Sequence, residues 1–454
     1  MANETTRRDF LTGVAGAGLG LALAGRATAA GRGARAAEAY RPAAGFAAPP
    51  LETVRMGFVG VGLQGGSHVE NFLRIPGVEI VAVCDVDGPR ASEVGHWVVA
   101  AGRPAPDLYT RGPEDFRRLC ERPDIDLVFN ATPWRWHVPV CLEAMNTGKH
   151  AATEVPAAYL VDDCWELVET AERTRRHCVM MENCNYGRSE MMVLNMVRRG
   201  LFGELLHGEG AYIHDLRAVK FANESEGLWR LEHSVSRNGN LYPTHGLGPI
   251  AQYMDVNRGD RLDYLVSMSS NARGLELYAR EHLPASDSRR RSYALGDMNT
   301  TLIKTKLGRT IVLQHDTTTP RPYSRINLVQ GTRGCFVGYP DRIYIEGRTP
   351  TPDGGHAWED AAAYRDEFEH PLWTKLEEDA AGAGHGGMDY LEDYRLIQSL
   401  VAGEPTDMDV YDAATLSAVI ELSEKSVAAK AKPMDVPDFT RGRWEVNEPL
   451  GIVS

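Results

Sequence analysis

The sequence lacks several features that whole classes of protein require. No apolar run in its 454 residues reaches the roughly 20 residues that a helix needs to span a bilayer. Positive charge is in the minority, with 49 Lys and Arg against 62 Asp and Glu, which disfavours binding to nucleic acid through its phosphates. No internal repeat is apparent. We therefore expect a folded globular protein that takes a small-molecule or glycan substrate, with no nucleic-acid partner and no stable membrane anchor.

Patterns typical of a metal site or a disulfide framework are missing as well. The seven cysteines are odd in number, and the sequence contains neither Cys-x-x-Cys nor His-x-x-x-His. Several of the cysteines lie inside apolar runs. We expect buried, reduced thiols and no bound metal.

The first 29 residues look like an export signal. The stretch Thr6-Arg-Arg-Asp-Phe-Leu11 precedes the apolar, Gly/Ala-rich run Val14–Ala24, and Ala27–Ala29 suits a signal peptidase. This pattern predicts a twin-arginine signal over residues 1–29, followed by an Ala/Gly/Pro-rich linker over residues 30–50. The alternatives are an ordinary secretory signal and a flexible tail. The twin-arginine machinery exports folded proteins, so we expect a periplasmic or secreted protein.

A glycine-rich turn between a strand and a helix predicts a dinucleotide site. The β-type run Val54–Val61 ends in Gly60-Val-Gly-Leu-Gln-Gly65, and a helical pattern follows. A second strand, Val78–Cys84, ends at Asp85, which lies 20 residues after Gly65. This order and spacing are those of the Rossmann fingerprint.

Each part of this fingerprint has a physical role. Gly60 permits the tight turn, Gly62 the close approach of the backbone to a pyrophosphate, and Gly65 the packing of helix on strand. The helix N-terminus attracts the phosphates. Asp85 would accept hydrogen bonds from the ribose hydroxyls and repel a 2′-phosphate, which favours NAD over NADP. The alternative is a structural glycine turn followed by a capping Asp.

Alternating strands and helices continue to about residue 185. The expected strands are Ile125–Ala131, a short one ending at Thr153, and His177–Met181. Because parallel sheets bind ligands at the carboxyl ends of their strands, the loops that leave these strands should line the site. The sequence therefore predicts an α/β protein whose residues 51–185 form a doubly wound, NAD-binding Rossmann domain.

The pattern changes after Gly203. The expected strands are Glu204–His214, Leu262–Ser269, Asn299–Lys306 and Thr310–His315, with long polar connections between them. They predict an α+β domain over residues 186–454, with a mostly antiparallel open sheet and a C-terminal segment that packs back.

Four stretches carry a resemblance to a known family. The order Gly-x-Gly-x-x-Gly, Ala-Thr-Pro, Glu-x-Pro and a His-bearing second domain resembles the glucose–fructose oxidoreductase and inositol dehydrogenase superfamily. More particular are Trp134–His137, Thr153–Ala158, Arg237–Pro249 and Pro437–Gly442. Together they resemble glycoside hydrolase family 109, the NAD-dependent α-N-acetylgalactosaminidases, over roughly residues 52–445.

One departure from the wider superfamily supports the narrower assignment. Most oxidoreductase members resemble Glu-Lys-Pro at the third strand-end loop, where the lysine assists proton transfer at the oxidised carbon. This chain has Val155 at that position, as the hydrolase family does. Simple oxidation of a free sugar hydroxyl is therefore disfavoured.

The resemblance implies two sets of site residues. Those lining NAD would be Gly60, Gly62, Leu63, Gln64, Gly65, Asp85, Trp134, Arg135, Trp136, His137, Glu154, Val155 and Asn183. Those lining the sugar would be Tyr212, Arg230, Tyr242, Pro243, Thr244, His245 and Tyr323. His245 would be the acid/base at C3 or C2, with Tyr242 as its catalytic partner. The tyrosines could instead be packing residues, and Trp134 and Trp136 could belong to the core.

Two further segments have open roles. Tyr186 is a further candidate for proton transfer. The segment from His385 to Asp389 either reaches the site from the C-terminal part of the chain or forms only a helix-entry turn.

The family chemistry explains how a hydrolase can use NAD. Oxidation at C3 of the sugar acidifies the C2 proton, its removal expels the glycosidic oxygen from C1, water adds at C1, and C3 is reduced again. NAD-dependent glycosidases need no pair of catalytic carboxylates. The expected function is hydrolysis of terminal N-acetylgalactosamine. The alternatives are an exported NAD(P)-dependent sugar oxidoreductase and a non-catalytic, NAD-containing sugar-binding protein; a homo-oligomer is compatible with each.

Overall fold

The structure is a computed structural model, and it describes residues 43–351, 354–449 and 452. The predicted export signal over residues 1–29 and most of the predicted linker lie outside these residues. No helix within the described ranges combines the length and the apolarity needed to cross a membrane.

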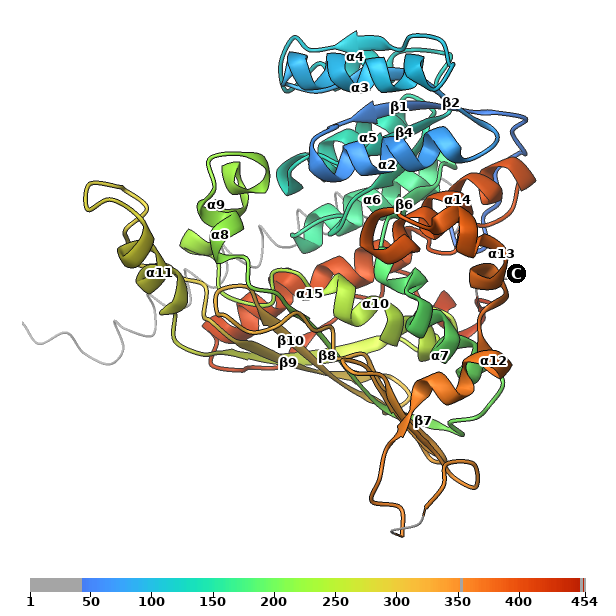
Figure 1. The fold of residues 1–454 in the computed structure, drawn as a ribbon, viewed down its shortest axis with the longest axis vertical. Helices are drawn as coiled ribbons and strands as arrows, with labels where there is room; N and C mark the ends of the chain where they lie inside the picture. Colours follow the sequence, from blue (N-terminus) through green and yellow to red (C-terminus); the bar gives the residue numbers. More distant parts are fainter. Residues whose placement is uncertain (1–42, 352–353, 450–451, 453–454) are drawn as a thin grey trace, which may run out of the picture. The chain divides into compact units, whose positions relative to one another are not determined.

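The first sheet has six parallel strands in the order β3-β2-β1-β4-β5-β6, which is the Rossmann order (Figure 1). Its strands are β1 (Val54–Val59), β2 (Val78–Cys84), β3 (Asp107–Tyr109), β4 (Leu127–Asn130), β5 (His150–Thr153) and β6 (Cys178–Met180). β4, β5 and β6 are buried throughout, as expected where helices cover both faces of a sheet. The predicted doubly wound fold is confirmed, while the short and mostly exposed β3 was missed.

Five α-helices alternate with these strands: α2 (Leu63–Arg74), α3 (Gly88–Ala100), α4 (Phe116–Cys120), α5 (His137–Asn146) and α6 (Val161–Thr174). The chain passes from β1 through α2 to β2 on one side, while β4 pairs with the other side of β1. This reversal of strand order places the carboxyl end of β1 at the switch point, where such sheets bind ligands.

The second sheet has nine strands in the order β14-β13-β12-β11-β7-β10-β9-β8-β15. Its strands are β7 (Leu205–Ile213), β8 (Leu262–Ser269), β9 (Asn299–Thr305), β10 (Thr310–Asp316), β11 (Leu328–Gly331), β12 (Gly334–Val337), β13 (Arg342–Ile345), β14 (Glu359–Asp360) and β15 (Met434–Asp435). Neighbours are antiparallel except β7 and β10, which are parallel. The mostly antiparallel sheet is thus confirmed. β11 to β15, two to four residues long, were not predicted.

The remaining α-helices surround this sheet or join it to the first one. They are α7 (Arg188–Arg198), α8 (Arg217–Phe221), α9 (Arg230–Ser236), α10 (Thr244–Tyr253), α11 (Gly274–His282), α12 (Arg365–Phe368), α13 (Pro371–Ala380), α14 (Met388–Ala402) and α15 (Val410–Ala428). The described 3₁₀ turns are η1 (Trp134–Trp136), η2 (Asn183–Tyr186), η3 (Ser225–Leu228), η4 (Ala361–Tyr364), η5 (Gly384–Gly387) and η6 (Arg443–Glu445).

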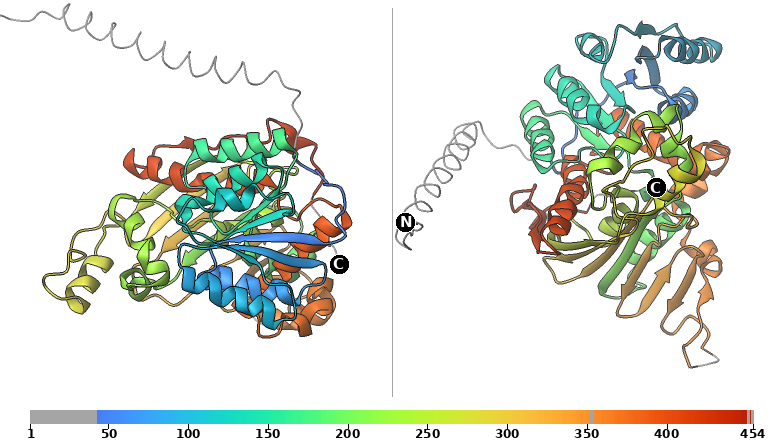
Figure 2. Two further views of the ribbon diagram at one scale, coloured as in Figure 1. Left: turned by 90° about the horizontal axis from the view of Figure 1, so that it is seen from above. Right: turned by 90° about the vertical axis from the view of Figure 1, so that its left-hand side faces the viewer.

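Two packing features position the site. Helix α10 crosses β7 so closely that a Cβ on Gly210 would lie 2.2 Å from the Gly246 carbonyl oxygen, so neither residue can carry a side chain. The C-terminal helices α14 and α15, orange to red in Figure 2, pack against α2 and α6 of the first sheet.

All seven cysteines are free, and six of them are buried.

Candidate functional site

The three glycines of the turn after β1 meet different surroundings. Gly60 has φ of 83°, and a Cβ there would lie 2.7 Å from the Ala131 carbonyl oxygen. A Cβ on Gly65 would lie 2.1 Å from the Gly60 carbonyl oxygen. A Cβ on Gly62 would meet no atom within 4 Å. The outer two glycines therefore serve the turn and its packing, while Gly62 borders open space in which a dinucleotide backbone can lie.

The groups around this turn fit a nicotinamide dinucleotide. Helix α2 begins at Leu63, whose side chain is 73% exposed, and its first turn carries no acidic residue to oppose a phosphate. The Asp85 carboxylate accepts backbone hydrogen bonds from Val61 at 2.8 Å and from Asp87 at 2.9 Å. A carboxylate has about four acceptor sites, so Asp85 can still receive both ribose hydroxyls.

The predicted site residues in the loop after β4 lie in different surroundings. Both ring nitrogens of His137 lie 2.7 Å from backbone carbonyl oxygens, those of Thr132 and Pro156. His137 is buried and ties together the loops after β4 and β5. Arg135 is exposed. Trp136 packs on Phe116 of the Rossmann domain, with ring centroids 6.0 Å apart.

The loops after β5 and β6 carry Glu154, Val155 and Asn183. Glu154 contacts His68 of α2, with Oε1 2.8 Å from Nε2, and its Oε2 accepts from the Val155 N–H. Val155 itself is buried. Asn183 Nδ2 donates to Asp389 of α14 at 2.6 Å.

His68 was absent from the predicted site, and Asp389 was named only as the end of a segment whose role was left open. His68 lies between Glu154 and Asp393, whose Oδ1 is 2.8 Å from its Nδ1. Burial acts to lower the pKa of His68, but these two carboxylates raise it well above its usual value. The His68 ring therefore links Glu154 of the predicted cofactor site to Asp393 of α14.

Four predicted residues form an aromatic cluster on the side of the second sheet. The ring centroids of Tyr212 and Tyr242 are 4.5 Å apart, and His245 lies 5.4 Å and 4.9 Å from them. Trp134 stacks on Tyr242 at 5.7 Å, so it belongs to this cluster. The Arg230 guanidinium lies over the rings of Trp134 and Tyr242, at 5.3 Å and 5.4 Å. The cluster offers ring faces, hydroxyl groups and a cation, which together suit a sugar.

His245 has a buried carboxylate behind it. Its Nδ1 lies 2.7 Å from Oε1 of Glu182, which is completely buried. Burial acts to raise the pKa of Glu182, but His245, buried Thr244 and the Cys184 N–H bring it below the usual value. The described residues offer no hydrogen-bond partner to Nε2 of His245. With Glu182 fixing Nδ1–H, Nε2 is the nitrogen available to exchange a proton.

The remaining predicted residues surround this pair. Pro243 immediately precedes α10 and sets the start of the helix. Tyr323 is 38% exposed, and its hydroxyl accepts from Arg325 at 3.1 Å. Burial raises the pKa of Tyr323 to about 12 and that of Tyr242 well above its usual value. Both phenols therefore remain proton donors at neutral pH.

Tyr186 points to another part of the chain. It is buried, and its hydroxyl donates to Asp407 at 3.1 Å, which leaves it engaged with the segment before α15.

Within the described part of the chain, one group of side chains has the composition of a metal site. Ligand atoms of Glu182, Cys184 and His245 lie within 4.8 Å of one another. Burial raises the pKa of the Cys184 thiol well above its usual value, which disfavours the thiolate that a metal would require. The Glu182–His245 contact already uses two of the three groups.

Comparison with known proteins identifies the family. The sequence profile described as "Glycosyl hydrolase 109, C-terminal domain" matches residues 186–446, and "Oxidoreductase family, NAD-binding Rossmann fold" matches residues 54–182. A protein of Shewanella pealeana named "Glycosyl hydrolase family 109 protein" is 52% identical over 413 residues, 90% of each chain. The "Alpha-N-acetylgalactosaminidase" of Shewanella oneidensis is 52% identical over 417 residues, again 90% of each chain.

The chain belongs to glycosyl hydrolase family 109. The family resemblance, the glycosidase class and the NAD cofactor predicted from the sequence are confirmed. The fold of this family 109 member is similar to that of an NAD-binding oxidoreductase from Klebsiella pneumoniae. The TM-score is 0.68 at 17% identity, covering 86% of this chain and 100% of the other. No comparison tests the roles of individual site residues, which stay predictions.

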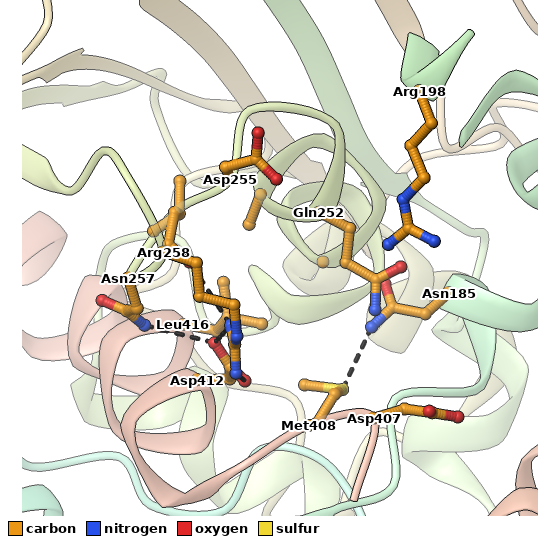
Figure 3. Close-up of a pocket in the computed structure, with 13 residues that line it drawn as sticks. Asn185, Arg198, Gln252, Asp255, Asn257, Arg258, Asp407, Met408, Asp412 and Leu416 are labelled. Atoms are coloured by element: carbon orange, nitrogen blue, oxygen red, sulfur yellow. Dashed lines mark hydrogen bonds and ion pairs between the residues drawn. The ribbon is translucent and has the colours of Figure 1, made fainter. Parts of the chain in front are cut away.

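Two cavities lie close to these residues in the family 109 chain. One, of about 410 Å³, is bordered by Trp134 and Arg135 and runs between α5 and α6. The other is shown in Figure 3 and is lined by Asn185 of η2, Arg198 and Asp407 among others. Its volume is about 30 Å³, roughly the space of one water molecule, so it cannot hold a sugar or a nucleotide.

Proposed function

We propose that this family 109 protein hydrolyses terminal N-acetylgalactosamine from glycans through transient oxidation at C3. The observation that carries the proposal is the buried Glu182–His245 pair within the cluster of Tyr212, Tyr242 and Arg230. The named activity of the Shewanella oneidensis relative supports the choice of sugar.

NAD, when bound by the Gly60–Gly65 turn and Asp85, supplies reversible oxidation at C3. His245, oriented by Glu182, exchanges a proton through Nε2, either at the C3 hydroxyl or at C2. Tyr242 donates a hydrogen bond to the oxygen that becomes negative, or relays its proton. Removal of the C2 proton expels the glycosidic oxygen from C1; water then adds at C1, and the proton returns to C2.

Arg230 fixes the sugar through its hydroxyls or its acetamido carbonyl. The ion pair with Glu226, at 2.8 Å, leaves other guanidinium N–H groups free to donate, since arginine has five. Tyr212 and Tyr323 provide ring faces and hydroxyls on the same side. Buried Val155 supplies no proton, so the proton chemistry falls to His245 and the tyrosines.

The first test is hydrolysis of p-nitrophenyl glycosides by the purified protein, without added NAD. We expect many turnovers on the N-acetylgalactosamine substrate and loss of activity when bound NAD is removed. A single round of sugar oxidation followed by a stall would instead support the alternative, an NAD(P)-dependent sugar oxidoreductase. Absence of any sugar conversion would support a sugar-binding protein.

A second test addresses the elimination step. Substrate carrying deuterium at C2 should lose the label to water during turnover, because the C2 proton passes to a base. Full retention of deuterium at normal turnover would exclude this route.

We propose that the protein is exported by the twin-arginine machinery to the periplasm or beyond. The Arg7-Arg8 pair and the apolar stretch that follows it support this proposal. Replacing both arginines with lysine should retain the full-length protein in the cytoplasm, as cell fractionation would show. Unchanged export would contradict it.

We also propose that the protein forms a homo-oligomer through the second sheet. Tyr264, Met268 and Leu302 share its outer face and are 39%, 66% and 50% exposed. An exposed apolar patch of this kind is typical of an interface. Sedimentation should show an oligomer that Met268→Glu weakens; a monomeric wild type would refute the proposal.

A further inference from the structure

The segment between α13 and α14 reaches the predicted cofactor site. It is the glycine-rich turn η5, in which His385, Gly386 and Gly387 all have positive φ angles, of 49°, 73° and 99°. A Cβ on Gly384 would lie 2.4 Å from Oδ2 of Asp389 and 3.0 Å from the Ser67 hydroxyl oxygen of α2. The turn therefore lies directly against the helix that follows the nucleotide-binding glycines.

Asp389 connects three side chains from distant parts of the chain. Its Oδ1 accepts from Asn183 at 2.6 Å, and its Oδ2 accepts from Gln64 at 3.2 Å. Oδ2 also lies 2.8 Å from Nδ1 of His385. Gln64 stands beside the predicted pyrophosphate turn, and Asn183 follows the strand nearest the predicted sugar side. Asp389 thus joins the predicted pyrophosphate turn to the loop after β6.

His385 differs from its partner in its exposure. The side chain of Asp389 is 1% exposed, whereas that of His385 is 52% exposed. Because Nδ1 faces Asp389, the outer nitrogen Nε2 is the one that can meet a ligand. The hydrogen bond that Nδ1 donates to Asp389 raises the pKa of His385, which favours the positively charged ring. Glu154 and His68 are the other charged groups that act on it.

We propose that His385 and Asp389 belong to the NAD site and retain the cofactor between turnovers. Asp389 is a positioning residue that holds Gln64 and Asn183, and His385 is a binding residue that presents a cationic donor to the diphosphate. The inference rests on the proposed function in one respect: a cofactor that is restored in each cycle gains from staying bound. The retention itself requires no sugar.

The test measures release of the cofactor in the absence of substrate. Purified protein is loaded with NADH, a large excess of NAD is added as a trap, and the loss of bound-NADH fluorescence gives the release rate. His385→Ala should raise this rate about tenfold, and His385→Lys, which restores a cation, should bring it back to within about threefold of wild type. His282→Ala, on the exposed end of α11, is the matched control and should release NADH as the wild type does.

Two results would overturn the inference. One is an unchanged release rate in His385→Ala. The other is restoration by His385→Gln but not by His385→Lys, which would exclude the role of charge. Asp389→Asn should also release NADH faster, with a melting curve to show that the variant is folded. Failure of glycoside hydrolysis with retention behaving as expected would remove the proposed function and leave this inference intact.

Discussion

Two histidine–carboxylate pairs stand on either side of the loop after β6, and they differ in burial. In the first pair, the side chains of His245 and Glu182 are 12% and 0% exposed; in the second, those of His385 and Asp389 are 52% and 1% exposed. In the first pair, the buried carboxylate orients a largely buried imidazole ring for proton exchange with an enclosed substrate. In the second pair, the exposed imidazole ring can present a charge to a ligand that binds over the ring. Burial, rather than residue type, distinguishes the two roles.

The largest effect should come from the recessed pair. His245→Ala removes the group that exchanges protons, and we expect turnover of a p-nitrophenyl substrate to fall about a thousandfold, in the range of general acid–base catalysis. NAD content after gel filtration should match the wild type, because this pair lies on the sugar side. Residual turnover near the wild-type rate would mean that another group exchanges the proton.

A second prediction concerns the partner of His245. Glu182→Gln keeps the shape but removes the carboxylate that accepts from Nδ1–H of His245, so turnover should fall about a hundredfold, less than in His245→Ala. The pH dependence of turnover should change as well, because Glu182, a carboxylate whose pKa His245 lowers, is absent from the variant. If turnover fell while the pH profile stayed the same, Glu182 would serve packing alone.

The exposed pair should show its effect in stability. Burial acts to raise the pKa of Asp389, but the neighbouring rings of His385 and His68 lower it to about 2. A shift of this size corresponds to about 2 kcal/mol, roughly a thirtyfold change in the unfolding equilibrium, which Asp389→Asn should lose at neutral pH.

The pH dependence of that loss has a definite sign. Asp389 has a lowered folded-state pKa, so its contribution is present above its unfolded value near 3.8 and disappears as the pH falls towards 2. His385 has a raised pKa, so its contribution is complete below 6.5 and disappears as the pH rises through the folded value. Urea unfolding should show the largest difference between wild type and Asp389→Asn from about pH 4 to 6.5. A difference that keeps growing above pH 8 would contradict the ion pair.

The smallest expected effect concerns the predicted ribose contact of Asp85. Asp85→Ala removes the acceptor for the ribose hydroxyls, and NAD binding should weaken by about tenfold, as titration calorimetry would show. Discrimination against NADP should weaken too. Wild-type affinity for NAD would refute the ribose role, and the Asp85 carboxylate would then serve only the Val61 and Asp87 backbone.

The sequence predicted the local features and missed the distant partners. β2 and β8 were predicted with the observed bounds, and the glycine turn was found, because apolar runs and short spacings determine them. The partner of His245 is 63 residues away, and Asp389 is 325 residues from Gln64, so neither contact leaves a trace in spacing. One signal was available: Glu182 follows the strand β6, at the edge where parallel sheets bind ligands. The segment from His385 to Asp389 is the turn that enters α14, and Asp389 contacts Gln64 and Asn183; its role in the site stays a prediction.

Glu182 and Asn183 are neighbours in the chain, yet their side chains serve opposite partners, His245 and Asp389. Consecutive Cα atoms across a trans peptide are separated by about 3.8 Å, a length set by covalent bonds. The peptide between these two residues therefore fixes the distance between the Cα atom that positions the His245 partner and the Cα atom that positions the Asp389 partner. Inserting one residue between Glu182 and Asn183 should leave both parts of the site folded but displace the Glu182–His245 contact relative to the Asn183–Asp389 contact.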